Sequence, residues 1–314
     1  MSRIGLLAAS MVLFTVAHGA EPPARTTPNA APAPATFELA LVDLQGQKKV
    51  LGTLPGSVFA PRLSPDGTRV AFELTEPPAA GQPQTRRLYV AELDQLDKRR
   101  ALQLTITTTL NTAPVWSPDG DWIMFLASGN GSDALYKQHS DGYIQPLYVI
   151  DGRAPEGWYK GGLLAFITLK DAHDYGISLL DLDTKKATVL VDVPGSAQHS
   201  SRISPDGKWL AYASDETGRF EVWLEPLPQT GKRFQLTRQG GRHPLWSPDG
   251  RTLYFDQDGR MFRMDVTLDA ANTSASEPAA LPISGFQQGE ARRQFDLTPD
   301  GKAFLMLFAV RTAP

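Results

Sequence analysis

Aspartate recurs at five positions within one short motif, and repeated carboxylates are groups that general acid and base catalysis can use. The five are Asp66, Asp119, Asp206, Asp249 and Asp300. Each follows a proline and precedes a glycine, in the order Ser-Pro-Asp-Gly or Thr-Pro-Asp-Gly. Proline at the second position of a turn, aspartate at the third and glycine at the fourth suit a type I turn. The sequence therefore predicts that these aspartates are structural turn residues and not catalytic ones.

Histidine and arginine form a second set of candidates, because several of them share one distance from the turn aspartates. Six or seven positions before such an aspartate, or just before a degenerate unit, the sequence has Arg153, His199, Arg242, His243 and Arg293. The same register contains no carboxylate, so this set is cationic in a chain whose formal net charge is −3. We expect it to bind an anionic ligand or an acidic protein segment, more strongly below pH ~6.5, where histidine is protonated.

The sequence lacks the motifs of several enzyme classes. It contains no Gly-x-Ser-x-Gly elbow, no His-Glu-x-x-His zinc motif, no glycine-rich phosphate loop and no cysteine. The alternative to a binding protein is a metal-dependent propeller enzyme, such as a polysaccharide lyase, with a divalent ion on His199, His243 and Gln294. Two imidazoles and one amide form an incomplete ligand shell. The sequence therefore predicts no metal and no cofactor, and it favours a protein that is not an enzyme.

The elements that position these residues repeat along the chain. The turn aspartates are separated by 53, 87, 43 and 51 residues, and apolar residues flank each turn. The long interval equals two units, and Gly161-Gly162 provides the turn of the degenerate one. A period of roughly 40 to 50 residues with several short strands is typical of a β-propeller blade. The sequence predicts an all-β fold, a six-bladed β-propeller with four antiparallel strands in each blade.

The two ends of the repeat region complement each other. Only fourteen residues follow Asp300, which is enough for a second strand but not for a third and a fourth. Before the first unit, Phe37–Leu44 and Lys49–Leu54 have the pattern of a third and a fourth strand. We therefore expect N-terminal strands to complete the last blade and close the ring, which removes exposed strand edges. The first strands would line a central channel, with the cationic residues at one mouth.

Tryptophan recurs in the predicted first strands, at Trp116, Trp158 and Trp246. A large aromatic side chain at this position can fill the space between neighbouring blades. We expect these residues to belong to the core.

The N-terminal segment has the features of a targeting sequence. Residues 1–20 contain Arg3, an apolar run and the small residues Ala17-His18-Gly19-Ala20, as in a cleaved signal peptide. The apolar run is shorter than the ~18 to 20 residues that a membrane span needs. Residues 21–36 are rich in proline and alanine, which predicts a disordered linker before a propeller at 37–314. We expect export to the periplasm, no membrane span and no nucleic-acid partner.

The repeats resemble the propeller of the TolB family, the periplasmic component of the Tol-Pal system, and related propellers that accompany bacterial kinases and serine peptidases. The resemblance covers about residues 37–310 and rests on the five turn motifs and on Ser214–Trp223. The separate α/β domain that precedes the TolB propeller is replaced here by the proline- and alanine-rich linker. The resemblance implies a partner in the cell envelope, such as a peptidoglycan-associated lipoprotein. We expect a monomeric, non-enzymatic binding module that uses its channel mouth.

Overall fold

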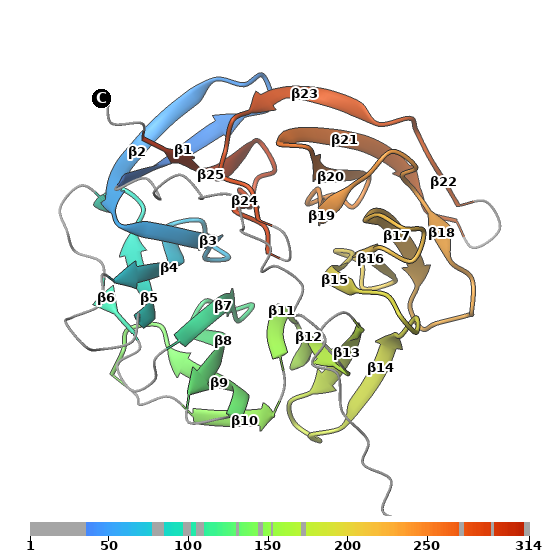
Figure 1. The fold of residues 1–314 in the computed structure, drawn as a ribbon, viewed down its shortest axis with the longest axis horizontal. Helices are drawn as coiled ribbons and strands as arrows, with labels where there is room; N and C mark the ends of the chain where they lie inside the picture. The colour runs from blue at the N-terminus through green and yellow to red at the C-terminus, as the bar shows by residue number, and fades with distance from the viewer. Residues whose placement is uncertain are drawn as a thin grey trace, which may run out of the picture. The chain divides into compact units, whose positions relative to one another are not determined.

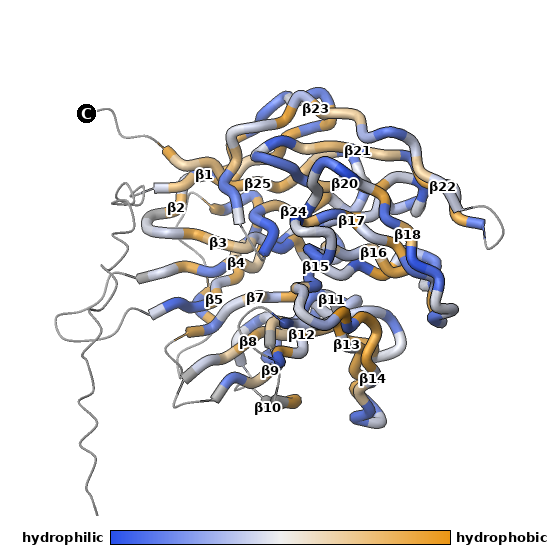
Figure 2. Tube along the Cα trace, turned by 45° about the vertical axis from the view of Figure 1, so that its right-hand side comes forward, coloured by the Kyte–Doolittle hydropathy of each residue, from blue (hydrophilic) through white to orange (hydrophobic). Residues whose placement is uncertain are grey.

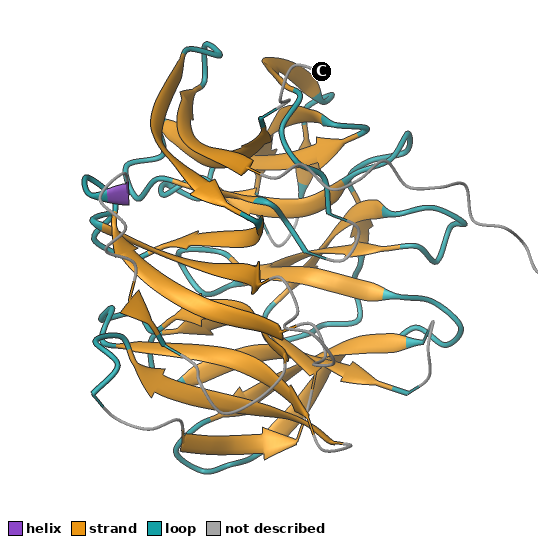
Figure 3. Cartoon of the chain, turned by 60° about the vertical axis from the view of Figure 1, so that its left-hand side comes forward, coloured by secondary structure: helices purple, strands orange, loops and turns teal. Residues whose placement is uncertain are grey.

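The structure is a computed structural model that describes ten segments of the chain. These are residues 36–76, 85–96, 102–104, 110–129, 132–143, 147–151, 153–170, 174–269, 273–289 and 292–310. Strands dominate them, with turns and loops at the strand ends (Figure 3). The predicted signal peptide and the predicted linker lie outside the described residues, except for Thr36, which is the first residue of a strand. Within the described segments, no helix is long and apolar enough to span a membrane.

The strands form antiparallel sheets that stand around one axis (Figure 1). The N-terminal strands β1 (Thr36–Asp43) and β2 (Lys48–Pro55) share a sheet with the C-terminal strands β24 (Phe295–Leu297) and β25 (Ala303–Ala309), in the order β2-β1-β25-β24. The strands predicted at Phe37–Leu44 and Lys49–Leu54 are therefore present, and β1 pairs with β25 along seven residues. The two ends of the described chain meet in this sheet.

An eight-stranded sheet follows along the chain. Its first half contains β3 (Ser57–Leu63), β4 (Arg69–Glu76), β5 (Thr85–Glu92) and β6 (Leu102–Gln103). Its second half contains β7 (Leu110–Trp116), β8 (Trp122–Gly129), β9 (Ser132–His139) and β10 (Leu147–Asp151). A single parallel pair, Arg86 with Leu110, joins the two halves. Each half otherwise has the antiparallel order of the other sheets.

Three further sheets complete the arrangement. One contains β11 (Arg153–Tyr159), β12 (Leu163–Leu169), β13 (Tyr175–Asp181) and β14 (Ala187–Val191). The next contains β15 (Gln198–Ile203), β16 (Trp209–Ser214), β17 (Glu221–Pro226) and β18 (Phe234–Gln235). The last contains β19 (Arg242–Trp246), β20 (Thr252–Gln257), β21 (Arg260–Thr267), β22 (Ser274–Ala275) and β23 (Ala279–Ser284). We call β3, β7, β11, β15, β19 and β24 the inner strands, because they lie nearest the axis in Figure 1.

The repeated turns connect each inner strand to the second strand of its sheet. In the first of them, Gly67 N donates to Ser64 O at 2.8 Å, and the Asp66 carboxylate accepts bonds from Ser64 Oγ at 2.5 Å and Thr68 N at 3.1 Å. Gly67 has φ +72°, a left-handed conformation that glycine adopts without strain. The degenerate turn at Gly161-Gly162 also has positive φ, at 76° and 71°. The turn residues predicted from the sequence are confirmed.

Five inner strands have a shift in pairing register, and in four of them the shift is a bulge at the same place before the turn. The pairing register shifts between Phe59 and Arg62, and at the equivalent places in β7, β15 and β19. A residue other than glycine adopts positive φ in each bulge: Ala60, Ala113, Ser200 and His243. Bulges re-aim backbone and side chains locally. Regular pairing with the second strand is therefore interrupted within these four inner strands.

Six clusters of buried apolar side chains lie between the repeat units of the described chain. Figure 2 shows hydrophobic residues distributed over the strands of the whole arrangement. The predicted packing of tryptophan between repeat units is confirmed at Trp116 and Trp246, which are buried. Trp116 Nε1 donates to Arg62 O at 2.9 Å, and Trp246 Nε1 donates to Arg202 O at 3.0 Å. Trp158 is half-buried against the cluster between β8 and β12. The two indole hydrogen bonds connect β7 with β3 and β19 with β15.

Candidate functional site

The cationic residues predicted from the sequence lie at the beginnings of the inner strands. Arg153 is the first residue of β11, and its side chain is outside what the structure describes. His199 is the second residue of β15, Arg242 and His243 begin β19, and Arg293 lies two residues before β24. The strand register thus places all five at the same end of the inner strands, which we call the mouth.

The two histidines are buried neighbours. His199 and His243 have 0% and 1% of their surface exposed, and their ring centroids are 5.7 Å apart. His243 Nδ1 lies 2.7 Å from Asp256 Oδ1, and His199 Nδ1 lies 2.8 Å from Ser200 Oγ. The Nε2 atom of each ring has no hydrogen-bond partner among the described residues. The pair is therefore not an exposed contact surface.

Burial holds the pKa of His199 well below its ordinary value of 6.5, and the nearby His243 and Arg242 lower it further. A neutral imidazole is the form that a desolvated site favours. The expectation that His199 gains positive charge as soon as the pH falls below ~6.5 is wrong.

The two arginines of the predicted set differ in their surroundings. The Arg242 guanidinium lies over the ring of Phe220, 4.6 Å from its centroid, and His199 packs on the same ring at 4.5 Å. Arg293 is buried; its Nη2 lies 2.9 Å from Asp296 Oδ1 and its Nε donates to Phe295 O at 3.0 Å. Arg293 therefore holds a carboxylate in place, whereas Arg242 is half-exposed on an aromatic surface.

Four carboxylates stand beside these groups, so the expectation that no carboxylate lies near them is wrong. They are Glu73, Glu156, Asp256 and Asp296. Glu73 and Asp256 come from second strands, β4 and β20, which a register count along the inner strands does not reach. Burial raises the pKa of Glu156 and of Asp296. The mouth is a mixed ionic cluster and not a ring of cations alone.

Four arginines line one cavity at the mouth, which we call the arginine cavity. They are Arg62, Arg202, Arg292 and Arg293, and the cavity has a volume of about 280 Å³. Arg202 Nη1 donates to Ser201 O at 2.5 Å and to Glu156 O. Arg62 is buried, which lowers its pKa to about 10, so it remains protonated at neutral pH. The cavity combines these cations with apolar lining residues such as Ala113 and Val115.

Arg62 and Arg202 were missed in the sequence, although a signal was available. Both lie four positions before a turn aspartate, and Asp296 occupies the same register before the last turn. Both guanidiniums interact electrostatically with Asp296. A comparison of the repeats at this position, in addition to the strand beginnings, would have found the three residues.

A second cavity of about 390 Å³ lies at the same end of the inner strands. Its lining includes Arg219, Phe220, Arg242, Asp256 and Asp258. The Arg219 guanidinium pairs with Glu221, 2.9 Å away, in the same part of the molecule. The mouth thus has a second cavity that charged side chains line.

The residues considered for a metal ion do not form a ligand set. Gln294 uses both ends of its amide: Oε1 accepts from Ala60 N at 2.8 Å, and Nε2 donates to Arg292 O at 3.2 Å. Within the described segments, no group of three or more histidine, cysteine, aspartate or glutamate side chains is placed to hold a metal ion. The alternative of a lyase built on His199, His243 and Gln294 therefore lacks its third ligand.

The repeated aspartates are turn residues, as predicted. In every complete turn the serine or threonine hydroxyl donates to the aspartate, and the backbone N–H two residues later does the same. These bonds, first of all that from the hydroxyl, lower the pKa of Asp66 to about 2 and also lower the pKa of Asp119, Asp206, Asp249 and Asp300. Their carboxylates therefore stabilise the turns through hydrogen bonds.

A protein-family model matches the first part of the repeat region. Residues 34–154 match the PD40 model, described as the TolB beta propeller domain.

Two curated relatives match part of the chain. An uncharacterized protein of Agrobacterium fabrum is 26% identical over 58% of this chain and 63% of its own length. An uncharacterized peptidase of Bacillus subtilis is 28% identical over 63% of this chain and 29% of its own length. The chain thus spans less than two thirds of either relative.

Solved structures share the fold. The structure of a putative TolB from Agrobacterium tumefaciens superposes with a TM-score of 0.66 and 19% identity, covering 88% of this chain and 99% of that one. TolB from Acinetobacter baumannii gives a TM-score of 0.56 and 19% identity, covering 79% and 66%. At this level of identity the likeness concerns the fold alone.

Proposed function

Because residues 34–154 match the model of the TolB β-propeller domain, we propose that this chain is an exported, non-enzymatic binding module of the cell envelope. It binds an acidic segment of a partner protein at the mouth of its channel. The signal-peptide pattern of residues 1–20 supports export to the periplasm. The protein acts as a monomer whose partner supplies the negative charge.

The proposed module has six blades. Three sheets and the two halves of the eight-stranded sheet each supply one blade, and β1, β2, β24 and β25 supply the sixth. Each proposed blade contributes one of the inner strands β3, β7, β11, β15, β19 and β24. The pairing of β1 with β25 supports closure of the ring by the N-terminal strands. A closed ring gives the mouth a fixed geometry.

The arginine cavity is the observation that carries the proposal. Arg62, Arg202, Arg292 and Arg293 converge on one space, although they come from three parts of the sequence. Guanidinium groups form strong, directional hydrogen bonds with carboxylates. The Nε atom of Arg62 is buried and has no hydrogen-bond partner among the described residues. A carboxylate of a partner would supply an acceptor for donors of this kind.

The charge balance of the cavity also favours an anion. Glu156 and Asp296 lie against the four arginines, and Glu73 is shared between Arg292 and Arg86, each 3.2 Å away. The cations therefore exceed the carboxylates. Burial of like charges is unfavourable unless counter-charges are near, so an acidic ligand adds stabilising interactions.

The test measures binding of fluorescein-labelled hexaglutamate to the purified protein by fluorescence anisotropy. Arg292→Ala and Arg242→Ala should each weaken binding about 5-fold, which corresponds to about 1 kcal/mol. Arg292 and Arg242 are better choices than the buried Arg293, whose removal would leave Asp296 without its partner. An increase from about 50 to about 300 mM salt should weaken binding as well.

The matched control is Arg251→Ala, which removes an exposed arginine beside the turn that ends at Gly250, at the opposite end of an inner strand. It should bind hexaglutamate like the unmodified protein. Absence of saturable binding, or equal losses in Arg251→Ala and Arg292→Ala, would contradict a specific site at the mouth.

A further inference from the structure

Prolines and glycines of the complete turns contact one another between neighbouring units. The proline of one turn packs against the turn glycine of the next unit, so that a Cβ placed on that glycine would lie 2.7 to 3.5 Å from the proline ring. The pairs are Pro65 with Gly120, Pro205 with Gly250, Pro248 with Gly301 and Pro299 with Gly67. These contacts form an interface between repeat units at the end of the inner strands opposite the mouth, which we call the turn face.

The degenerate unit interrupts this interface. When the units are aligned on the residue before each motif, Trp158 corresponds to Trp116, Lys160 to the turn proline and Gly161 to the turn aspartate. The next turn glycine, Gly207, accordingly has no described atom within 4 Å of a Cβ built on it. The unit lacks both the proline ring and the carboxylate that the complete turns provide.

A groove lies where the proline is missing. It has a volume of about 880 Å³ and a mainly apolar lining that includes Trp158, Leu179, Leu190, Ile203 and Leu227. Gly207 and Lys160 also line it. We call it the turn-face groove. Its size lies in the range of pockets that hold small molecules or short peptide segments.

A smaller groove of about 460 Å³ continues it on the other side of the degenerate unit. Pro118, Trp158, Tyr159 and Lys160 line both. The two grooves together flank the unit in which the proline and the aspartate are absent.

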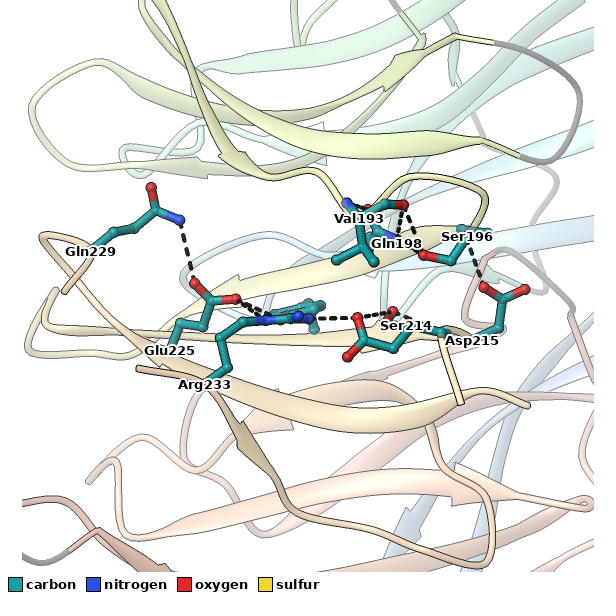
Figure 4. A network of polar contacts seen from close by, with 11 residues as sticks. Val193, Ser196, Gln198, Ser214, Asp215, Glu225, Gln229 and Arg233 are labelled. Carbon is teal, nitrogen blue, oxygen red and sulfur yellow. Dashed lines mark hydrogen bonds and ion pairs between the residues drawn. The ribbon is translucent and has the colours of Figure 1, made fainter. Parts of the chain in front are cut away.

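The wall of the groove is held by a polar network (Figure 4). Gln229, which lines the groove, donates from Nε2 to Leu190 O and to Glu225 Oε2, the latter at 3.3 Å. Glu225 is fixed in turn by Arg233, whose Nε lies 3.0 Å from Oε1. These bonds connect β14 with β17 across the groove's outer end. These hydrogen bonds therefore hold the wall of the groove in place without an occupant.

We propose that the turn-face groove binds a proline followed by an acidic residue in a segment of a partner protein. The groove is continuous with the proline–glycine interface, and at four equivalent places this chain fills the same position with a proline followed by aspartate. Lys160 is exposed and forms no ion pair with any carboxylate of the described residues, so its ammonium group is available to the partner's acidic residue. Aromatic surfaces such as Trp158 pack well against proline rings. The partner's proline thus supplies the proline–glycine contact that is missing at Gly207.

The probe is a fluorescein-labelled peptide with the sequence of residues 246–252 of this chain, Trp-Ser-Pro-Asp-Gly-Arg-Thr. We expect saturable binding to the purified protein in an anisotropy titration. The peptide with alanine in place of proline should bind at least 10-fold more weakly. Lys160→Glu should weaken binding of the proline peptide at least 5-fold, without loss of stability, because the side chain is exposed.

Lys302→Glu is the matched control. Lys302 is also exposed and follows a turn on the same face, but the glycine of that turn, Gly301, is already covered by Pro248. This variant should bind the peptide like the unmodified protein. Binding of hexaglutamate at the mouth should be the same in Lys160→Glu, which separates this proposal from the proposed function.

Three results would overturn the proposal. The first is no saturable binding of the proline peptide. The second is equal affinity for the proline and alanine peptides, or equal losses in Lys160→Glu and Lys302→Glu. The third is a concentration-dependent dimer in sedimentation velocity that Lys160→Glu abolishes, since the occupant would then be a second copy of this chain.

Discussion

Replacing His199 with phenylalanine should remove a pH dependence from the stability of the protein. The imidazole is buried against Phe220, His243 and Tyr175, with ring-centroid distances of 4.5, 5.7 and 6.5 Å. Its pKa is held well below 6.5 by burial first, and then by the nearby His243 and Arg242. In the unfolded chain the same group takes up a proton near pH ~6.5. The two states therefore bind different numbers of protons.

The sign and size of the effect follow from this difference. Below pH ~6.5, and down to the folded pKa of His199, the unfolded state binds more protons, so the free energy of unfolding decreases as the pH falls. One proton corresponds to about 1.4 kcal/mol per pH unit. Between pH of about 7.5 and about 5.5 the unmodified protein should lose about 1.4 kcal/mol through this group. The raised pKa values of Glu156 and Asp296 act in the opposite sense, but both proteins contain them.

Urea unfolding monitored by tryptophan fluorescence at the two pH values measures this loss. Each protein is compared with itself, so the packing cost of the substitution cancels. Phe220→Leu is the control, because it changes the packing around the same imidazole and keeps the titrating group. The argument for a buried neutral His199 would be refuted if His199→Phe lost as much stability as the unmodified protein over this pH interval.

Three further predictions concern the fold. Deleting residues 36–55 removes β1 and β2 and exposes the edge of β25, so size-exclusion chromatography should show aggregation. Deleting residues 21–35 should change the free energy of unfolding by less than about 0.5 kcal/mol. Gly301→Val and Gly207→Val both force a left-handed backbone on a β-branched residue, at a cost of about 1 to 3 kcal/mol. Gly301→Val should melt lower, because its Cβ would lie 2.7 Å from Pro248; equal melting temperatures would contradict the proline–glycine contact. Trp116→Phe leaves Arg62 O without its donor, and urea unfolding should show a loss of about 1 to 3 kcal/mol.

The turns and strands could be predicted from the sequence because their determinants are local. Proline, aspartate and glycine at adjacent positions specify the turn, and alternating apolar residues specify the strands beside it. Even the degenerate turn at Gly161-Gly162 was recognisable, since two adjacent glycines can adopt positive φ. The strand pattern of Phe37–Leu54 likewise predicted the two strands that pair beside β25.

The partners of the charged residues at the mouth could not be predicted, because each pair joins distant parts of the chain. Arg292 and Glu73 are 219 positions apart and meet only after the sheets have assembled. The bulges were hidden as well: Ala60 and His243 adopt positive φ although neither is glycine, so residue type gives no warning. Strand register alone placed His243 correctly at the mouth, but it could not show that the ring is buried against Asp256.

The left-handed residues of the inner strands have a consequence for hydrogen exchange. Ala60 N donates to Gln294 Oε1 at 2.8 Å, Ala113 N donates to Glu73 Oε1 at 2.7 Å, and Ser200 N donates to Glu156 Oε1. Each acceptor belongs to the preceding repeat unit and not to the strand's own ladder. If one sheet opens while the preceding unit stays in place, such an amide can keep its hydrogen bond. The bond is lost when the two adjacent units separate. Exchange of these three amide protons therefore reports the separation of adjacent units, and it should occur together with global unfolding and more slowly than fraying of the outer strands.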